Sequence, residues 1–163
     1  MYDTPLSIEQ VLTLLAETPK RIAALTDGLA PAQLQTSPKQ DEWSANDVLA
    51  HLRSCADMWG NYIRTIIAED MPTIRAVNPT TWIKKTNYRE LEFQPSFRTF
   101  ITQRADLLAV LETLPHEGWS RTAIVTGAGK ARERTVFTYA QWLVNHERTH
   151  IKQIARIVLT MRM

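Results

Sequence analysis

The chain is poor in the features that mark secreted, membrane or nucleic-acid-binding proteins. It has one cysteine in 163 residues, which excludes an internal disulfide framework and fits a reducing compartment. No apolar run approaches the roughly 18 residues that a membrane-spanning helix needs. The first residues lack a basic segment followed by an apolar run, so we expect no signal peptide. The net charge of +2 is too small to indicate nucleic acid or an anionic membrane as a partner. We therefore expect a cytoplasmic protein.

Length and composition predict one globular domain that covers residues 1–163. The hydrophobic fraction of 44% and the charged fraction of 22% are ordinary for such a domain. Apolar residues recur at helical spacing in four segments. The first follows a capping box at Ser7, the second begins at Ser44 and runs to about residue 69, the third ends before Pro115, and the fourth starts near Thr135. Four amphipathic helices predict an all-α fold, a four-helix bundle.

Residues 71–94 interrupt this pattern, so we expect a long irregular crossover between helices two and three. A connection of that length in a compact domain usually has a function. Its Trp82 and Tyr88, with Trp59 and Tyr62 of the second helix, are candidates for a pocket mouth, although aromatic residues at helical spacing more often belong to a core. Residues 126–130 contain two glycines between short alternating runs. They predict a small hairpin and lack the phosphate-loop pattern.

The strongest functional signal is the string His146-Glu147-Arg148-Thr149-His150. Residues four apart lie on one face of a helix, so both imidazoles can point at a common ion. Imidazole is the commonest metal-binding side chain, and His51 on the second helix is the candidate for a third ligand. Three nitrogen ligands with an open position are typical of a catalytic metal site.

The same string has the HExxH form of a metallopeptidase, in which the glutamate is the general base. The chain has Gln153 and Arg156 where the metzincin extension needs glycine and histidine. No acidic residue follows His150, and the sequence offers little strand to align a peptide. A small peptidase is therefore the third choice among the functions considered.

The histidines continue apolar stripes, which predicts that they face the bundle interior. His146 and His150 follow the stripe of Trp142 and Ile154, and His51 lies on the face of Val48 and Met58. Histidine is not a default core residue, so three of four turned inward need a reason. The alternative is that each is a hydrogen-bonded core histidine.

Three stretches of the chain resemble the DinB-like superfamily, whose relatives include YfiT-type and thiol-transferase enzymes. They are residues 43–52 (WSANDVLAHL), residues 118–121 (GWSR) and the closing His146-xxx-His150-xx-Gln153-Ile154. The resemblance implies an antiparallel-type four-helix bundle with a long crossover, often a homodimer, and a divalent metal on His51, His146 and His150. It also implies a metal that activates water or a low-molecular-weight thiol such as bacillithiol, mycothiol or glutathione. One departure is Glu147, where relatives often carry aspartate.

Three further residues have open roles. Glu147 is a candidate general base or partner of a ligand, and the alternative is a solvated helix carboxylate. Cys55, one turn beyond His51, is a candidate fourth ligand or nucleophile, and the alternative is a core position. His116 follows a proline and is expected at the surface.

The sequence as a whole predicts a divalent-metal-dependent enzyme, with zinc or nickel as the plausible ions on nitrogen ligands. We expect a thiol-dependent S-transferase or a hydrolase that acts on a small-molecule substrate. The main rival is a metal-binding bundle without turnover that has a binding or stress-response role.

Overall fold

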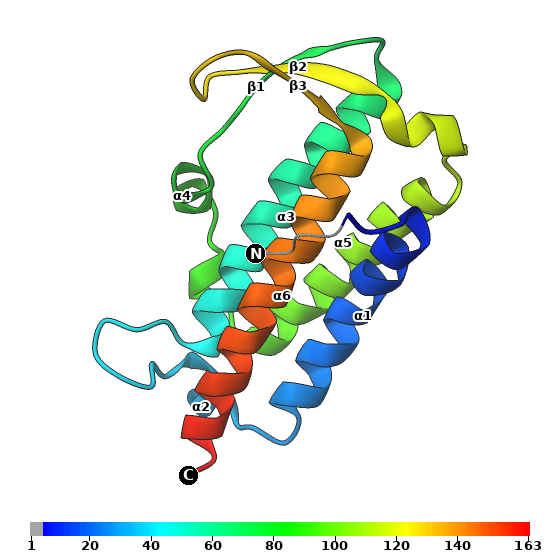
Figure 1. Cartoon of the computed structure of the whole chain (residues 1–163). Coiled ribbons are helices and arrows are strands. Elements are labelled where there is room, and N and C mark those ends of the chain that lie inside the picture. The colour runs from blue at the N-terminus through cyan, green and yellow to red at the C-terminus, as the bar shows by residue number, and fades with distance from the viewer. Residues whose placement is uncertain (1–4) are drawn as a thin grey trace.

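The computed structural model describes residues 5–163 and shows a bundle of four long helices (Figure 1). They are α1 (Ile8–Thr26), α3 (Ala45–Ala68), α5 (Phe93–Glu112) and α6 (Val136–Met161). The four-helix bundle predicted from the apolar spacing is confirmed. Between residues 5 and 163, no helix is both long enough and apolar enough to cross a membrane.

The capping patterns at Ser7 and Ser44 both start helices, as the sequence predicts. The Ser7 side chain accepts a hydrogen bond from the Gln10 amide, and the Gln10 side chain accepts one from the Ser7 amide. Ser44 and Asp47 make the same reciprocal pair at the start of α3. Each box satisfies two backbone N–H groups that the first helical turn leaves without a partner.

Neighbouring helices in the bundle are not all antiparallel. Helix α1 packs on α5 and α6, and α3 packs on the same two helices. Helices α1 and α6 run in the same direction, because Leu6 bonds Gln141 near their starts and Arg162 bonds the Leu25 carbonyl near their ends. Helices α3 and α5 are also parallel, since Asn46 at the start of α3 donates to the carbonyl of Leu91 just before α5, and Gln103 farther along α5 donates to Asp57 farther along α3. The antiparallel-type arrangement implied by the resemblance therefore holds only for the α3–α6 and α1–α5 neighbours.

The long crossover is a consequence of this topology. Helix α3 has 24 residues and is about 36 Å long, so the chain must travel back along the bundle before a parallel helix can begin. Residues 69–92 make this return, as predicted. They form strand β1 (Thr73–Arg75), a short helix α4 (Pro79–Trp82) and two 3₁₀ turns, η1 (Ile83–Lys85) and η2 (Tyr88–Glu90).

A small sheet covers the end of the bundle where α3 ends and α6 begins (Figure 1). Strands β2 (Thr122–Thr126) and β3 (Arg132–Thr135) form the predicted antiparallel hairpin. Gly127 and Gly129 in its turn have φ of +88° and +81°, a conformation that residues with a Cβ rarely adopt. The pattern did not predict that β1 pairs in parallel with β2 as a third strand. The remaining short elements are α2 (Pro31–Gln35) and η3 (His116–Ser120).

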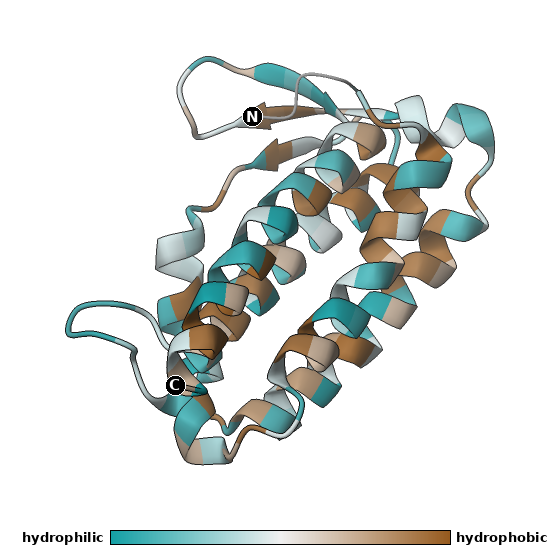
Figure 2. Ribbon diagram, turned by 60° about the horizontal axis from the view of Figure 1, so that its bottom comes forward, coloured by the Kyte–Doolittle hydropathy of each residue, from teal (hydrophilic) through white to brown (hydrophobic). Residues whose placement is uncertain are grey.

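The apolar faces of the helices meet inside the bundle in one core cluster. Hydrophobic and hydrophilic segments alternate along the long helices, as expected for helices with one buried face (Figure 2). The two ends of α6 differ in what they contact. Its first turns pack below the sheet, and its last turns lie beside α2 and the end of α1, where Gln33 donates to the Met161 carbonyl. The middle of α6 holds both histidines and faces the first half of α3.

Candidate metal centre

Three imidazole rings converge between α3 and α6. The ring centres of His51 and His146 lie 4.8 Å apart, those of His51 and His150 lie 4.7 Å apart, and those of His146 and His150 lie 4.5 Å apart. The α6 pair is one turn apart on a single face, and His51 approaches from the second turn of α3. The structure thus brings together all three residues that the sequence selects as ligands.

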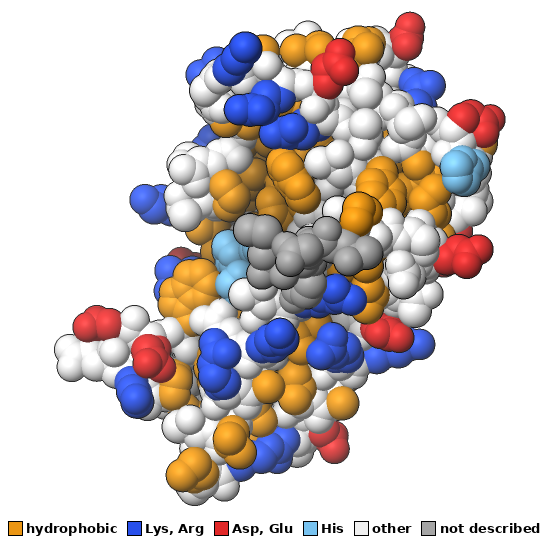
Figure 3. All heavy atoms as spheres, in the orientation of Figure 1, with side chains coloured by type: hydrophobic (Ala, Val, Ile, Leu, Met, Phe, Trp, Pro, Cys, Tyr) orange, Lys and Arg blue, Asp and Glu red, His pale blue; other side chains and the backbone are white. Residues whose placement is uncertain are grey.

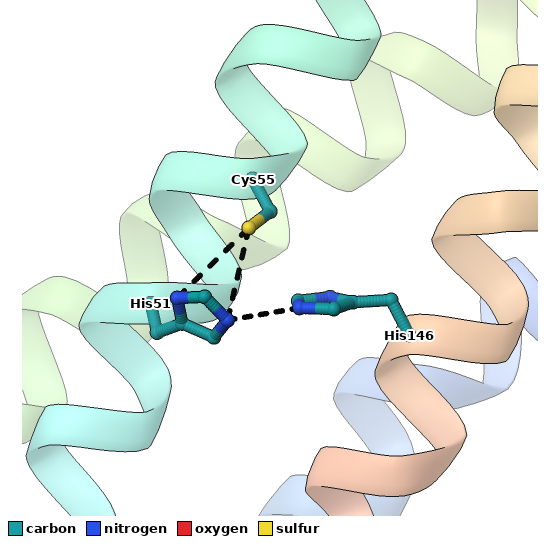
Figure 4. Close-up of side chains that lie close together, drawn as sticks. All are labelled: His51, Cys55 and His146. Carbon is teal, nitrogen blue, oxygen red and sulfur yellow. Dashed lines mark hydrogen bonds between the residues drawn. The ribbon is translucent and has the colours of Figure 1, made fainter. Parts of the chain in front are cut away.

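The nitrogen geometry of His51 and His146 fits a shared ion. His51 Nε2 and His146 Nε2 point at one another across 2.9 Å (Figure 4). Two nitrogens that each bind an ion at about 2.1 Å lie about 3.0–3.4 Å apart for bond angles of about 90–110°, so the observed separation is close to the lower end of this range. Nδ1 of His146 is buried and has no hydrogen-bond partner among the described residues. The ring is therefore held by packing, with Nε2 directed at His51.

Burial keeps two of these imidazoles neutral at pH 7. It lowers the pKa of His51 to about 4, with a smaller contribution from the charge of His150. It lowers the pKa of His146 to about 3, assisted by the charges of His150 and His51. Neutral imidazole is the form that binds metals, so the fold prepares both rings for coordination without a loss of protons at neutral pH.

The third ring is oriented by a neighbour on the same helix. Nδ1 of His150 lies 2.7 Å from Oε1 of Gln153. An amide oxygen only accepts, so Nδ1 carries the proton and Nε2 is left to coordinate. Such an outer partner commonly fixes the tautomer of a metal-binding histidine. Gln153 is therefore a positioning residue, a role that its place in the closing sequence motif did not indicate.

Cys55 is a core residue that also lies beside the imidazole of His51. Its side chain is 1% exposed, and its sulfur lies 3.8 Å from Nε2 of His51 (Figure 4). Donor atoms of His51, Cys55 and His146 all lie within 4.8 Å of one another, whereas His150 joins the group by its ring position and is not in this set. Burial first, and then the charges of Glu147 and Asp57, raise the pKa of the Cys55 thiol to about 12. A thiol with that pKa is protonated at pH 7, so Cys55 is no free nucleophile, and only a bound cation would make it a thiolate ligand.

Two tryptophans cover the imidazoles. Trp43 lies nearly parallel to His150 at a ring separation of 6.3 Å, and it lies 5.2 Å from His51. Trp59 meets His146 edge-on at 5.2 Å. In the sequence, Trp43 stands out only as the first residue of the 43–52 family motif. The available signal was its position directly before Ser44, the cap of α3, eight residues ahead of His51.

Glu147 lies in the bundle core, away from the imidazole nitrogens. Its carboxylate is fully buried and accepts two hydrogen bonds from the Arg104 guanidinium, at 2.8 and 2.5 Å, and one from the Thr18 hydroxyl at 2.9 Å. Arg104 comes from α5 and Thr18 from α1. The solvated carboxylate considered as an alternative is wrong. The general-base role is not supported by this geometry either, because both oxygens are held by donors on other helices.

Two cavities flank the histidines along α6. The larger, about 600 Å³, adjoins His150 and is lined by residues of the 38–43 loop and the last turns of α6. The smaller, about 180 Å³, lies toward the sheet and reaches Trp59 and Tyr62. The expected wall from residues 71–94 is present only in part, since Ala76, Val77 and Pro79 line the smaller cavity and none of that segment lines the larger one.

Two of the four aromatic candidates lie outside both cavities. Trp82 is in the last turn of α4 and lines neither. Tyr88 covers the Arg53 guanidinium at 3.7 Å and donates to Asp57 at 2.5 Å, which fastens the crossover to α3. His116 is exposed in η3, as expected.

Comparison with known proteins agrees with this fold. YfiT from Bacillus subtilis, described as "a probable metal-dependent hydrolase with an unusual four-helix bundle topology", superposes with a TM-score of 0.72 at 19% identity, over 96% of this chain and 91% of YfiT. A Geobacillus thermodenitrificans protein named "Putative metal-dependent hydrolase" is 25% identical over 90% of this chain and 82% of its own length. A protein of the same description from Halalkalibacterium halodurans is 25% identical over 93% and 85%. The model of the DinB superfamily matches residues 14–154, a span that includes His51, His146 and His150, and the chain therefore belongs to the DinB superfamily.

Proposed function

We propose that the chain is a divalent-metal-dependent enzyme that acts on a small molecule, with His51, His146 and His150 as the ligands. The observation that carries this proposal is the triangle of imidazoles, 4.5–4.8 Å apart and contributed by two helices. Burial holds two of the rings in the neutral, coordinating form. The relatives named as metal-dependent hydrolases support the same chemistry.

The residues around the rings orient and partly cover them. Gln153 holds the His150 tautomer, and Trp43 and Trp59 shield the rings from two sides. A divalent ion on three neutral imidazoles keeps its full charge and supplies a Lewis acid that lowers the pKa of a bound water or thiol. No protein carboxylate among the described residues belongs to the imidazole cluster, so the donor set is neutral unless Cys55 ionises.

Hydrolysis is the first candidate reaction, because the similar proteins carry that name. Transfer of a low-molecular-weight thiol is the second, and the two cavities favour it. One adjoins His150 and the other reaches Trp59, which touches His146. A two-substrate reaction needs room for both partners next to the same ion, and two separate cavities beside the histidines provide it.

The peptidase alternative loses its main support in the structure. In an HExxH peptidase the glutamate acts on the metal-bound water. Here Glu147 is paired with Arg104 in the core. Of the HExxH string, only the two histidines therefore belong to the proposed metal site.

The metal content of protein purified without an affinity tag tests the ligand set. We expect about one divalent ion per chain, and a sharp drop in occupancy for His51→Ala, His146→Ala and His150→Ala. The matched control is His116→Ala, which removes an exposed histidine outside the cluster. Cys55→Ser separates a three-histidine site, which keeps its ion, from a site that uses the thiolate. Full occupancy in all three histidine variants would reject the assignment.

Cobalt-substituted protein tests the reaction class and the inert rival together. A thiolate-to-metal absorption on addition of glutathione or a bacillithiol mimic is expected for the thiol transferase. Ester or amide hydrolysis without thiol is expected for the hydrolase. A site that binds neither thiol nor water, with its last position filled by Cys55, would instead support a metal-binding bundle without turnover.

A further inference from the structure

The hairpin of β2 and β3 presents three cations to the smaller cavity. Lys130, Arg132 and Arg134 all line it, and Glu133 does not. Successive side chains of a strand point to opposite faces, so Arg132 and Arg134 share one face of β3 and Glu133 takes the other. The basic side chains of β3 therefore face the cavity, and its acidic side chain faces away from it.

The remaining walls of this cavity are mostly aromatic and apolar. Trp59 and Tyr62 come from α3, and Tyr139 and Trp142 come from the first half of α6. Arg134 holds its guanidinium 5.1 Å from the centre of the Trp142 ring. Figure 3 shows basic side chains gathered over the hairpin with hydrophobic side chains directly below them. We call this cavity the basic-aromatic pocket.

The cations of the pocket are not neutralised by the protein. No aspartate or glutamate is among its lining residues. Within residues 5–163 the carboxylate ion pairs are Arg89–Asp47 and Arg104–Glu147, both outside the pocket. Two arginines and a lysine that converge on one cavity repel each other, and an anion in the cavity would relieve that repulsion.

We propose that the basic-aromatic pocket binds the carboxylate of a small aromatic acid, and that this acid is the substrate class of the metal site. The carboxylate would pair with Arg132 and Arg134, since guanidinium matches the carboxylate fork, and the ring would lie against the tryptophans. The volume of about 180 Å³ is below the roughly 300–1,000 Å³ of drug-sized pockets, so it suits a single ring. Trp59 lines the pocket and contacts His146 edge-on, so a bound acid would be separated from the proposed ion by one side chain. Only the substrate role rests on the proposed function, because binding of the acid needs no metal.

Calorimetric titration with benzoate, and with the neutral analogue benzamide, tests the pocket in metal-loaded and metal-free protein. We expect benzoate to bind both forms and benzamide to bind more weakly. Arg134→Gln should weaken benzoate about tenfold, as for loss of one charge-assisted contact, and leave benzamide unchanged. The matched control is Arg98→Gln, which removes the same charge from an exposed position on α5 that does not line the pocket. Thermal melts of each variant check folding, and Lys130→Gln in the exposed turn provides a second variant of the pocket.

Three outcomes would overturn the proposal. Benzoate that binds only the metal-loaded protein, and binds Arg134→Gln as well as the wild type, would be a ligand of the ion alone. Equal losses in Arg134→Gln and Arg98→Gln would show an effect of net charge. A wild type that binds neither compound at millimolar concentration would leave the pocket without this function. Benzoate binding to the metal-free protein is measured separately. This test would therefore still be valid if His51, His146 and His150 proved not to bind a metal.

Discussion

The buried pair Arg104–Glu147 allows a quantitative test of what the glutamate of the HExxH string does. Glu147 is fully buried and Arg104 is 2% exposed, and two hydrogen bonds join them. Glu147→Gln keeps the shape of the side chain and removes its charge, which leaves the guanidinium uncompensated in the core. Loss of one partner of a buried pair costs about 3–5 kcal/mol. For a chain of this size each kcal/mol moves the melting temperature by about 2–4 °C, so we expect a fall of roughly 6–20 °C.

Circular dichroism melts and urea titrations of the metal-loaded and metal-free protein measure this loss. The control is the double variant Arg104→Met with Glu147→Leu, which replaces both charges by apolar groups of similar length. Removal of both partners is often neutral or stabilising, so the double variant should regain most of the lost stability. The double variant could instead lose as much free energy of unfolding as the two single variants together. That result would show that the broken ion pair does not cause the loss in Glu147→Gln.

The same variant separates a structural from a catalytic glutamate. Well below its melting temperature, Glu147→Gln should retain the ion and most of the turnover, because the carboxylate does not reach the imidazole cluster. An unchanged melting temperature with loss of turnover would refute this account. It would return Glu147 to the role of general base that the sequence suggested.

Two further predictions concern the imidazoles. Burial lowers the pKa of His51 to about 4 and of His146 to about 3, against 6.5 in the unfolded chain, so the unfolded state binds more protons between these values. Metal-free protein should therefore lose stability as the pH falls from about 6.5 toward 4, and His146→Gln should flatten that part of the profile in urea titrations. Removal of the ion by a chelator should lower the melting temperature without unfolding the bundle, because the ion would join α3 to α6 while the core remains. An unchanged melting temperature after verified removal would argue against a shared ion.

The helices could be predicted from the sequence because their signals are local. The capping boxes at Ser7 and Ser44 and the apolar spacing between them depend only on residues within a few turns. The convergence of His51 with His146 followed from the same periodicity, since each lies on an apolar stripe. The parallel pairing of β1 with β2 depends on contacts about fifty residues apart, and three residues of strand carry no pattern of their own.

The cavity walls were harder to predict for a related reason. Residues 38–42 have a polar, turn-rich composition typical of a simple connection. Together with Trp43, however, this segment borders the cavity beside His150. Composition describes how such a segment turns and does not indicate what it lies against. The 71–94 crossover was recognised by its length, but length alone did not show that most of it packs on the outside of α3.

Glu147 shows why a motif needs its structural context. Adjacent residues of a helix point about 100° apart, so His146 and Glu147 cannot both face one neighbour. In the sequence, Glu147 continues the buried stripe of Leu143 and Ile151, one turn before and one turn after it. Arg104 lies likewise on the apolar stripe of α5, one turn after Phe100. A carboxylate and a guanidinium that both lie on core faces must pair, because neither can be buried alone. Helix α6 therefore turns its histidines toward α3 and its glutamate toward α1 and α5, and the HExxH spacing arises from two separate requirements on one helix.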